Sequence, residues 1–281
     1  MAEKRRGRNS KGGVLIIIGG HEDHDGDRVI LKELASHVDD GKLVLATVAS
    51  REPDGYREKY QAAFSDLGVK DIIELYVDER EQAVDAEKVK LLDGVNAVFF
   101  SGGDQLRITS QIADTPISER VHEIFASGGV IAGTSAGASV MSETMLVRGP
   151  NAASFRMGDL GMAPGLGLLP NVIIDQHFAE RGRIGRLIGA VSQNPRVLGI
   201  GIDEDTAIVV EGQKFRVIGS GAVYLVDASG VSHSNIAEAA AEQALSIYDL
   251  KLHVLSSGDG FDLEARRPVH LSEPEQHHSH T

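Results

Sequence analysis

Ser135, in Gly133-Thr134-Ser135-Ala136-Gly137, is the residue of this sequence best placed for nucleophilic chemistry. A short apolar run precedes the motif, and a helix-compatible stretch, 138–145, follows it. This spacing matches G-x-S-x-G, the sharp strand-to-helix turn that holds a serine hydroxyl above a sheet. Glycine suits both flanking positions because a β-carbon there would clash with the adjoining strand or helix. A Gly-rich turn with an inert serine is the alternative, so the rest of the chain must supply the context.

A serine nucleophile needs a base, and the base needs an orienting acid. Of the eleven histidines, His177 is the one that we place at the end of a predicted strand, 172–178, beside other polar residues. Three consecutive acids at 203–205 follow another predicted strand, 197–202. Side chains alternate along an extended chain, so Glu204 points away from its two neighbours. The pattern alone leaves open which of the two faces meets the histidine.

A second polar cluster, at 21–25, contains His21 and His24 in H-x-x-H spacing beside carboxylates. These residue types could bind a metal, but no helix places both histidines on one face. We interpret the cluster as a polar loop at a helix N-terminus, where acids are favoured by the helix dipole. Three histidines near the C-terminus, at 277, 278 and 280, are interpreted as part of an unstructured tail. We predict no metal site and no cofactor.

Strands and helices alternate through the first half of the chain, which predicts an α/β fold with a mostly parallel sheet and helices on both faces. The predicted strands are 14–18, 43–48, 72–77, 97–100 and the run before Ser135, and the predicted helices are 27–37, 56–67, 83–92, one after Gln105, and 115–126. Ligands of such sheets bind beyond the carboxyl ends of the strands. Residues 101–105 and Ser135 both lie at such ends, so we expect them to share one crevice.

The second half is predicted to continue with a loop at 147–170 that could cover a site. The other predicted elements are a helix that carries three arginines and continues to about residue 191, β-ribbons at 206–210 and 215–226, an Ala/Glu-rich helix at 238–247 and a strand at 250–255. We see no internal repeat and no linker. The predicted organisation is a disordered lead at 1–12, one catalytic domain at 13–267 and a flexible tail at 268–281.

The composition of the 281 residues, 42% hydrophobic and 25% charged, is that of a soluble globular protein. The net charge of −13 argues against a nucleic-acid partner, because phosphate backbones are bound by basic surfaces. The absence of cysteine excludes disulfides, thiolate catalysis and cysteine zinc sites. No stretch has the length of a membrane span or of a secretory signal, so we expect a cytoplasmic protein without a membrane partner. The sequence leaves open whether the chain forms a homodimer.

Three segments together resemble the cyanophycinase family, and the resemblance covers about 13–267. They are the Ser135 motif, the run from Asp175 through Phe178 with the arginines after it, and residues 201–207. Cyanophycinases are serine exopeptidases related to dipeptidase E and, more remotely, to class I glutamine amidotransferases. The resemblance therefore implies a three-layer, flavodoxin-like or class I glutamine amidotransferase-like sandwich. It also implies hydrolysis of cyanophycin, a poly-aspartate in which each β-carboxyl carries an arginine, to β-Asp-Arg dipeptides.

The resemblance also implies a role for each site residue. Ser135 would be the nucleophile, His177 the base and Glu204 the orienting acid, which resolves the choice that the pattern left open. Gly103 and Ala136 would donate N–H groups to the oxyanion. The implied substrate-binding residues are Gln105, Asp175, Gln176, Arg181, Arg183 and Arg186. Arginine binds carboxylates bidentately, and Asp175 could accept from the substrate guanidinium.

Two other functions compete with this interpretation. One is an α-aspartyl dipeptidase of the same superfamily, although those chains are typically shorter and are not expected to carry the Asp-Gln-His-Phe run with three arginines. The other is a non-catalytic binding or sensor protein on the same scaffold. The intact Ser/His/Glu set argues against it, and labelling by a generic acylating serine reagent would discriminate.

Overall fold

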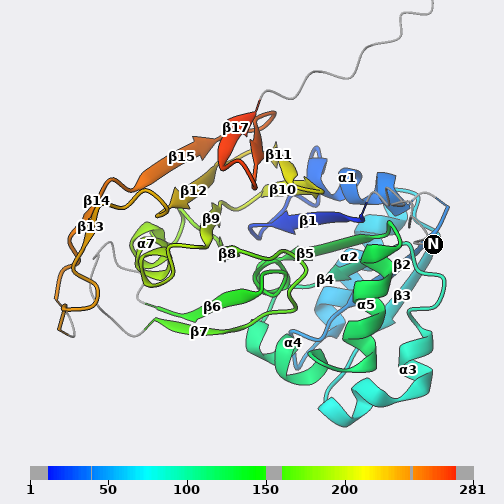
Figure 1. Cartoon of the computed structure of the whole chain (residues 1–281). Coiled ribbons are helices and arrows are strands. Elements are labelled where there is room, and N and C mark those ends of the chain that lie inside the picture. Colours follow the sequence, from blue (N-terminus) through cyan, green and yellow to red (C-terminus); the bar gives the residue numbers. More distant parts are fainter. Residues whose placement is uncertain (1–11, 39, 150–159, 241–242, 270–281) are drawn as a thin grey trace, which may run out of the picture.

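A computed structural model describes residues 12–38, 40–149, 160–240 and 243–269. Most of the predicted lead and tail, and residues 150–159 of the predicted loop, lie outside this part of the chain. One sheet has nine strands in the order β17-β16-β11-β10-β1-β5-β4-β2-β3, and a second has four in the order β15-β12-β9-β8 (Figure 1). Two further pairs, β6 with β7 and β13 with β14, form separate ribbons.

Five neighbouring strands of the large sheet are parallel, which confirms the predicted parallel sheet. They are β1 (Val14–Ile18), β5 (Val130–Thr134), β4 (Ala97–Phe100), β2 (Lys42–Ala46) and β3 (Asp71–Leu75). Apart from β3, their residues are almost all buried. Continuous apolar runs of this kind are typical of parallel strands that are covered on both faces.

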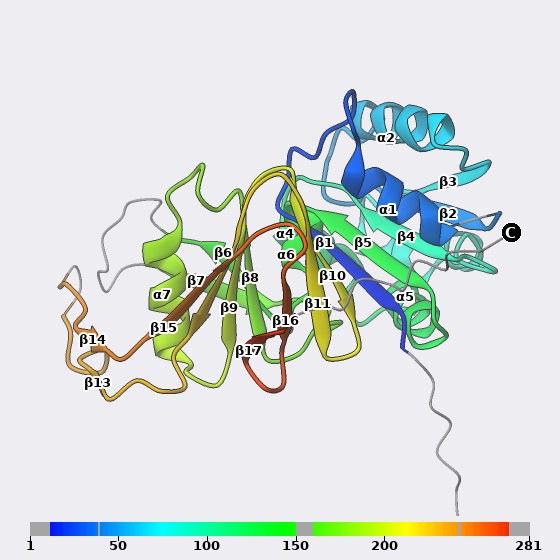
Figure 2. The same ribbon diagram turned by 90° about the horizontal axis from the view of Figure 1, so that it is seen from above.

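Helices cover both faces of the parallel strands because successive strand residues point to opposite sides. Ile16 and Ile18 pack with α1 (Val29–Val38) and α2 (Asp54–Asp66). Leu15 and Ile17 belong to the apolar cluster of α4 (Gln105–Ile112) and α5 (Pro116–Ala126). Figure 2 shows α1 and α2 on one side of the parallel strands and α5 on the other.

The sequence analysis did not predict the antiparallel extension of the large sheet or the separate second sheet. Four antiparallel strands extend the large sheet from β1: β10 (Thr206–Glu211), β11 (Lys214–Gly219), β16 (Gly260–Asp262) and β17 (Arg267–Val269). The second sheet contains β8 (Val172–Gln176), β9 (Leu198–Ile202), β12 (Val223–Asp227) and β15 (Lys251–Leu255), with β8 parallel to β9. Helix α7 (Ile184–Gln193) packs on it through Leu187, Ala190 and Val191. The backbone N–H of His177 donates to Gly19 O at 2.8 Å and so joins the end of β8 to the end of β1.

The predicted helix at 138–145 is wrong. Helix α6 covers only Ala136–Ser139, and β6 (Thr144–Arg148) begins five residues later and pairs with β7 (Gly161–Pro164). The helix stops because the carbonyl oxygens of Val140 and Met141 accept from the N–H groups of Leu166 and Leu169. The described part of the predicted loop at 147–170 therefore contains strand residues.

Three other predicted elements also differ. The predicted helix 83–92 divides into the 3-10 helix η1 (Arg80–Val84) and α3 (Ala86–Lys90), because Asp85 between them caps α3 by accepting from Glu87 N. The predicted ribbon 215–226 divides at Gly219, φ +102°, into β11 and β12, which belong to different sheets. Within the described part of 238–247 there is no helix; Ser246 N donates to Asn235 Oδ1, beside the ribbon of β13 (His233–Ser234) and β14 (Ile247–Tyr248).

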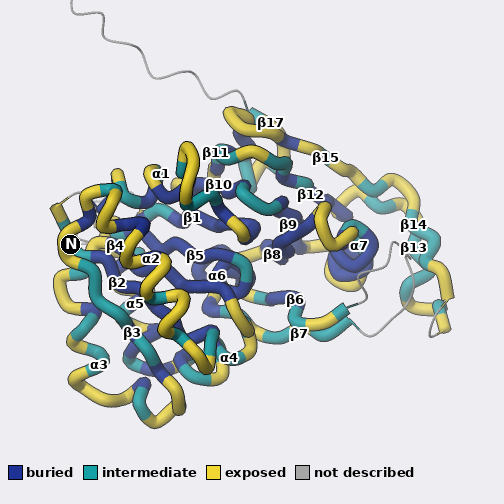
Figure 3. The backbone as a smooth tube through the Cα atoms, turned by 180° about the vertical axis from the view of Figure 1, so that it is seen from behind, coloured by how far each residue is buried: buried dark blue, intermediate teal, exposed yellow. Residues whose placement is uncertain are grey.

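Burial follows this architecture: the strands β1, β5, β8 and β9 are buried and the outer helices expose one side (Figure 3). None of the helices within the described ranges is both long and apolar enough to cross a membrane.

Candidate active site

Ser135 occupies a strained turn between β5 and α6. Its φ of +52° and ψ of −108° are uncommon for a residue with a side chain and persist where the surrounding structure enforces them. A β-carbon on Gly133 would lie 2.4 Å from Gly137 O, and one on Gly137 would lie 2.3 Å from Phe100 O. Both flanking positions therefore require glycine, as the motif predicted, and the turn has the form of a nucleophile elbow.

Hydrogen bonds join Ser135, His177 and Glu204 in one chain. Ser135 Oγ lies 2.9 Å from His177 Nε2, and His177 Nδ1 lies 2.6 Å from Glu204 Oε1. The structure thus brings together the three residues that the sequence analysis selected. The neighbouring acids face elsewhere: Asp203 accepts from Ala179 N and Ala222 N, and Asp205 accepts from Asp23 N and Ser220 Oγ.

The electrostatic environment keeps the His177 imidazole neutral over a wider pH range than a free histidine. Burial lowers the pKa of His177 below its ordinary value of 6.5, the hydrogen bond with Glu204 opposes this, and the charge of Arg181 lowers it further. For Glu204, burial alone would raise the pKa, but hydrogen bonds from His177 and His21 bring it below its ordinary value. A neutral imidazole beside an ionised carboxylate can accept the proton of a serine hydroxyl.

Two backbone segments that contain the predicted oxyanion donors border the serine. A β-carbon on Gly102 would lie 3.6 Å from Ser135 Cβ, so the turn after β4 runs next to the nucleophile. Gly103 has φ +141°, and a β-carbon there would lie 2.5 Å from Ala49 O. Ala136 directly follows the serine and starts α6. The predicted N–H donors Gly103 and Ala136 thus flank Ser135, and their catalytic role stays a prediction.

A buried ion-pair network lies on one side of the serine. Asp175, which is 1% exposed, accepts from Arg186 Nε at 2.6 Å, from a second nitrogen of Arg186, and from Arg183 Nη1 at 3.2 Å. Arg183 also donates to Gln176 Oε1 at 2.7 Å. Burial lowers the pKa of Arg183 to about 10. The two arginines are therefore held rigidly, although only Arg186 lies within α7; Arg181 and Arg183 precede the helix.

Asp175 does not border the cavity beside Ser135, and both of its carboxylate oxygens are used by Arg183 and Arg186. A direct bond from Asp175 to a substrate guanidinium, as expected from the sequence, does not fit this arrangement. Its observed contacts position the arginines instead. Gln105 does border the cavity, with its Nε2 donating to Leu146 O at 3.0 Å.

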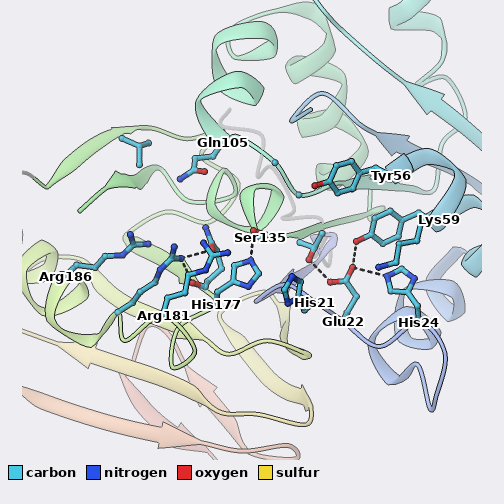
Figure 4. Close-up of a pocket in the computed structure, with 17 residues that line it drawn as sticks. His21, Glu22, His24, Tyr56, Lys59, Gln105, Ser135, His177, Arg181 and Arg186 are labelled. Carbon is cyan, nitrogen blue, oxygen red and sulfur yellow. Dashed lines mark hydrogen bonds and ion pairs between the residues drawn. The ribbon is translucent and has the colours of Figure 1, made fainter. Parts of the chain in front are cut away.

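The cavity has a volume of about 520 Å³ and extends to both sides of Ser135 (Figure 4). We call one side the arginine side; it is formed by Gln105, Gln176, Arg181, Arg183 and Arg186. We call the other the α2 side; it is formed by Glu22, His24, Tyr56, Lys59 and Tyr60. The sequence analysis predicted the residues of the arginine side but none of those of the α2 side.

Glu22 is the buried anion of the α2 side, with 4% of its surface exposed. It accepts from Thr134 Oγ1 at 2.6 Å and from the hydroxyl of Tyr60, and it lies 3.8 Å from His24 Nε2. Burial alone would raise the pKa of Glu22, but its interactions with His24, Thr134 and Tyr60 lower it below its ordinary value. A charged carboxylate thus lies beneath Thr134, the residue before the nucleophile.

His21 also contacts the Ser–His–Glu chain, which the sequence analysis did not anticipate. Its Nδ1 lies 2.8 Å from Glu204 Oε2, and its ring meets that of His177 edge-on at a centroid distance of 5.0 Å. Each of the two carboxylate oxygens therefore faces one imidazole. His21, His177 and Glu204 each place one atom of a type that can bind metal within 4.8 Å of the other two, and hydrogen bonds already join both histidines to Glu204. The cluster at 21–25 is a loop, as expected, and its two histidines lie beside different acids, His21 beside Glu204 and His24 beside Glu22.

Comparison with known proteins gives this geometry a family context. The model of peptidase family S51 matches residues 15–218. Cyanophycinase from Geminocystis herdmanii is 39% identical over 259 residues, which cover 91% of this chain and 95% of that protein. Cyanophycinase from Synechococcus elongatus is 38% identical over 262 residues, which cover 92% and 81%. A solved structure of a peptidase from an acI-B1 actinobacterium superimposes with a TM-score of 0.67 at 24% identity over 91% of this chain and 98% of that one, which is a likeness of fold.

Proposed function

This chain belongs to peptidase family S51, and we propose that it is a serine exopeptidase that hydrolyses cyanophycin to β-Asp-Arg dipeptides. The observation that carries the proposal is the hydrogen-bonded chain Ser135–His177–Glu204, whose serine and histidine border the same cavity as three arginines. The first feature suits acyl transfer and the second suits a substrate rich in carboxylates.

The reaction would proceed through an acyl-enzyme. Ser135 Oγ attacks a main-chain carbonyl carbon while His177 Nε2, at 2.9 Å, takes the hydroxyl proton. The N–H groups of Gly103 and Ala136 would stabilise the oxyanion of the tetrahedral intermediate. His177 then returns the proton to the leaving amine, and water repeats the sequence to release the acyl group. Glu204 holds the imidazole in the required tautomer through Nδ1.

The arginine side of the cavity would bind one branched unit of the polymer. Each arginine branch carries a free α-carboxylate and a guanidinium, so a binding site needs cations and hydrogen-bond acceptors together. Arg181, Arg183 and Arg186 supply the cations, and two residues with side-chain amides, Gln105 and Gln176, border the same cavity. Asp175 would act indirectly, by holding Arg183 and Arg186 in position.

The helices on both faces of the parallel strands support a further inference, that the parallel part of the fold is the three-layer sandwich of class I glutamine amidotransferases. A cytoplasmic location stays a prediction of the sequence analysis, and whether the chain forms a homodimer stays open.

The test is to compare wild-type protein with Ser135→Ala and Arg183→Ala. Ser135→Ala should lower kcat on cyanophycin by roughly three or more orders of magnitude without unfolding the protein, since only the oxyanion site and binding would remain. Arg183→Ala should lower kcat/KM on cyanophycin and still allow a small acylating reagent to label Ser135. Near-normal turnover by folded Ser135→Ala would exclude this mechanism.

A further inference from the structure

The α2 side of the cavity is built from one face of a helix. Tyr56, Lys59 and Tyr60 are spaced i, i+3 and i+4 on α2, which places their side chains next to one another. In Figure 4, Tyr56 and Lys59 lie on the opposite side of Ser135 from Arg181 and Arg186. A substrate that spans the serine would therefore contact both groups.

Lys59 is the cation on this side that has no acidic partner. Arg57, on the same helix, pairs with Asp54 at 3.3 Å and with Glu74 at 3.5 Å. Within the described ranges, no carboxylate lies within 4.0 Å of the Lys59 ammonium, although the residue borders the cavity. An ammonium in this position can pair with a substrate carboxylate without breaking an existing ion pair.

The same side also contains groups that suit a cation. The buried carboxylate of Glu22 lies under Tyr60, and the exposed Tyr56 ring borders the same space. His24 has a buried Nδ1 without a hydrogen-bond partner in the described structure. An aromatic ring and an anion that border the same cavity are groups that suit a bound guanidinium.

A peptidase must hold the chain on both sides of the bond that it cuts, and in cyanophycin each side carries a zwitterionic arginine branch. On this basis, which rests on the function proposed above, we propose that the α2 side is a second substrate site. It binds the branched Asp-Arg unit across the scissile bond from the unit on the arginine side. Lys59 pairs with the α-carboxylate of that arginine branch, and Tyr56 packs against its guanidinium. Glu22 supplies the negative field behind them.

The size of the cavity agrees with two occupied sides. Its volume of about 520 Å³ falls in the usual range for pockets that enclose a small ligand. Arg181, Arg183 and Arg186 border only one part of this volume, and the remainder extends past Ser135 to α2. A site for a single unit would leave the α2 side unused.

The experiment uses a synthetic substrate of two linked β-Asp-Arg units and two derivatives, each with the branch carboxylate of one unit converted to an amide. The enzymes are wild type, Lys59→Met, Lys59→Arg and Arg183→Ala, with Lys70→Met as a control because Lys70 is exposed and lies outside the cavity. We expect Lys59→Met to lower kcat/KM about two- to fivefold on the unmodified substrate, as for one exposed charge pair. Lys59→Arg should retain most of the rate, and Lys70→Met should equal wild type.

The derivatives identify the carboxylate that Lys59 contacts. Lys59→Met should have the same effect on one derivative as on the unmodified substrate and no effect on the other, in which the partner carboxylate is missing. If Lys59→Met had the same effect on all three substrates, or no effect on any, the proposal would be overturned. It would also be overturned if Lys59→Met and Arg183→Ala lost their effects on the same derivative, because both cations would then contact the same carboxylate. Failure of wild type to cut any of the three would instead count against the proposed function.

Discussion

Replacing Asp175 by Asn tests whether this carboxylate positions arginines or contacts the substrate. Asp175 is 1% exposed and is the acidic partner of two guanidinium groups that are themselves less than 9% exposed. The substitution keeps the size of the side chain and removes its charge, which leaves two buried cations without a counter-ion. Breaking a buried pair in this way typically costs about 3–5 kcal/mol. At roughly 2–4 °C per kcal/mol for a chain approaching this size, the melting temperature should fall by about 6–20 °C.

Thermal unfolding followed by circular dichroism measures this effect, with Asp78→Asn as the control. Asp78 also pairs with an arginine, Arg107 at 2.7 Å, but it is half exposed, so its loss should lower the melting temperature much less than the loss of Asp175. If Asp175→Asn melted within about 2 °C of wild type and raised only the KM for cyanophycin, the reasoning would be refuted. Asp175 would then contact the substrate directly, as the sequence analysis expected.

Three further predictions concern the Ser–His–Glu chain. Glu204→Gln should lower kcat about 10²–10⁴-fold, because the tautomer of His177 is no longer fixed, whereas Asp205→Asn should have a much smaller effect; the reverse order would show that the acid is misassigned. The rate should rise with pH as His177 loses its proton, with a midpoint below 6.5 because burial and, after it, the charge of Arg181 lower the pKa of His177. Arg181→Gln should move this midpoint to higher pH. A shift to lower pH would contradict the effect assigned to the Arg181 charge. His21→Ala should lower kcat roughly tenfold with little change in KM, because the hydrogen bond from His21 to Glu204 is lost. His21→Gln should retain much of the activity, since its amide can still donate to Glu204. Equal losses of kcat in both variants would show that the hydrogen bond to Glu204 is unimportant.

The parallel strands and the serine turn could be predicted because their signals are local. Residues 14–18 form a continuous apolar run, and buried strands of a parallel sheet require such runs. A β-carbon on either glycine around Ser135 would lie 2.3–2.4 Å from a backbone oxygen, so both positions require glycine. Both features are properties of a few consecutive residues.

The α2 side of the cavity could not be predicted from local sequence. Glu22 meets Thr134 across 112 positions of sequence and Tyr60 across 38, so its burial depends on the packing of β1, β5 and α2. The position of His21 depends on a left-handed backbone, φ +48°, which the residue type does not signal. The pairing of Asp175 with two arginines could not be predicted either. Charge complementarity shows that an aspartate can bind a guanidinium, but it does not show whether that guanidinium belongs to the substrate or to the protein.

Two segments that were wrongly predicted as helices show that long-range contacts can override local helix propensity. Residues 138–145 have helix-compatible composition, but two of the carbonyl oxygens of this segment are used by Leu166 and Leu169. In 238–247, Asn235 pairs with Ser246 and brings the two ends of the segment together, which a helix along it would keep apart. Tertiary context overrides weak propensities of this kind.

The most direct test of the proposed function is to identify the products that the purified protein forms from cyanophycin. Wild-type protein and Ser135→Ala would be incubated with cyanophycin, with α-linked poly-aspartate and with a series of α-Asp dipeptides, and the products analysed by mass spectrometry. The account predicts β-Asp-Arg dipeptides from cyanophycin, formed by wild type alone, and no reaction with the other substrates. Free aspartate from the α-Asp dipeptides, with cyanophycin untouched, would contradict it and identify an aspartyl dipeptidase.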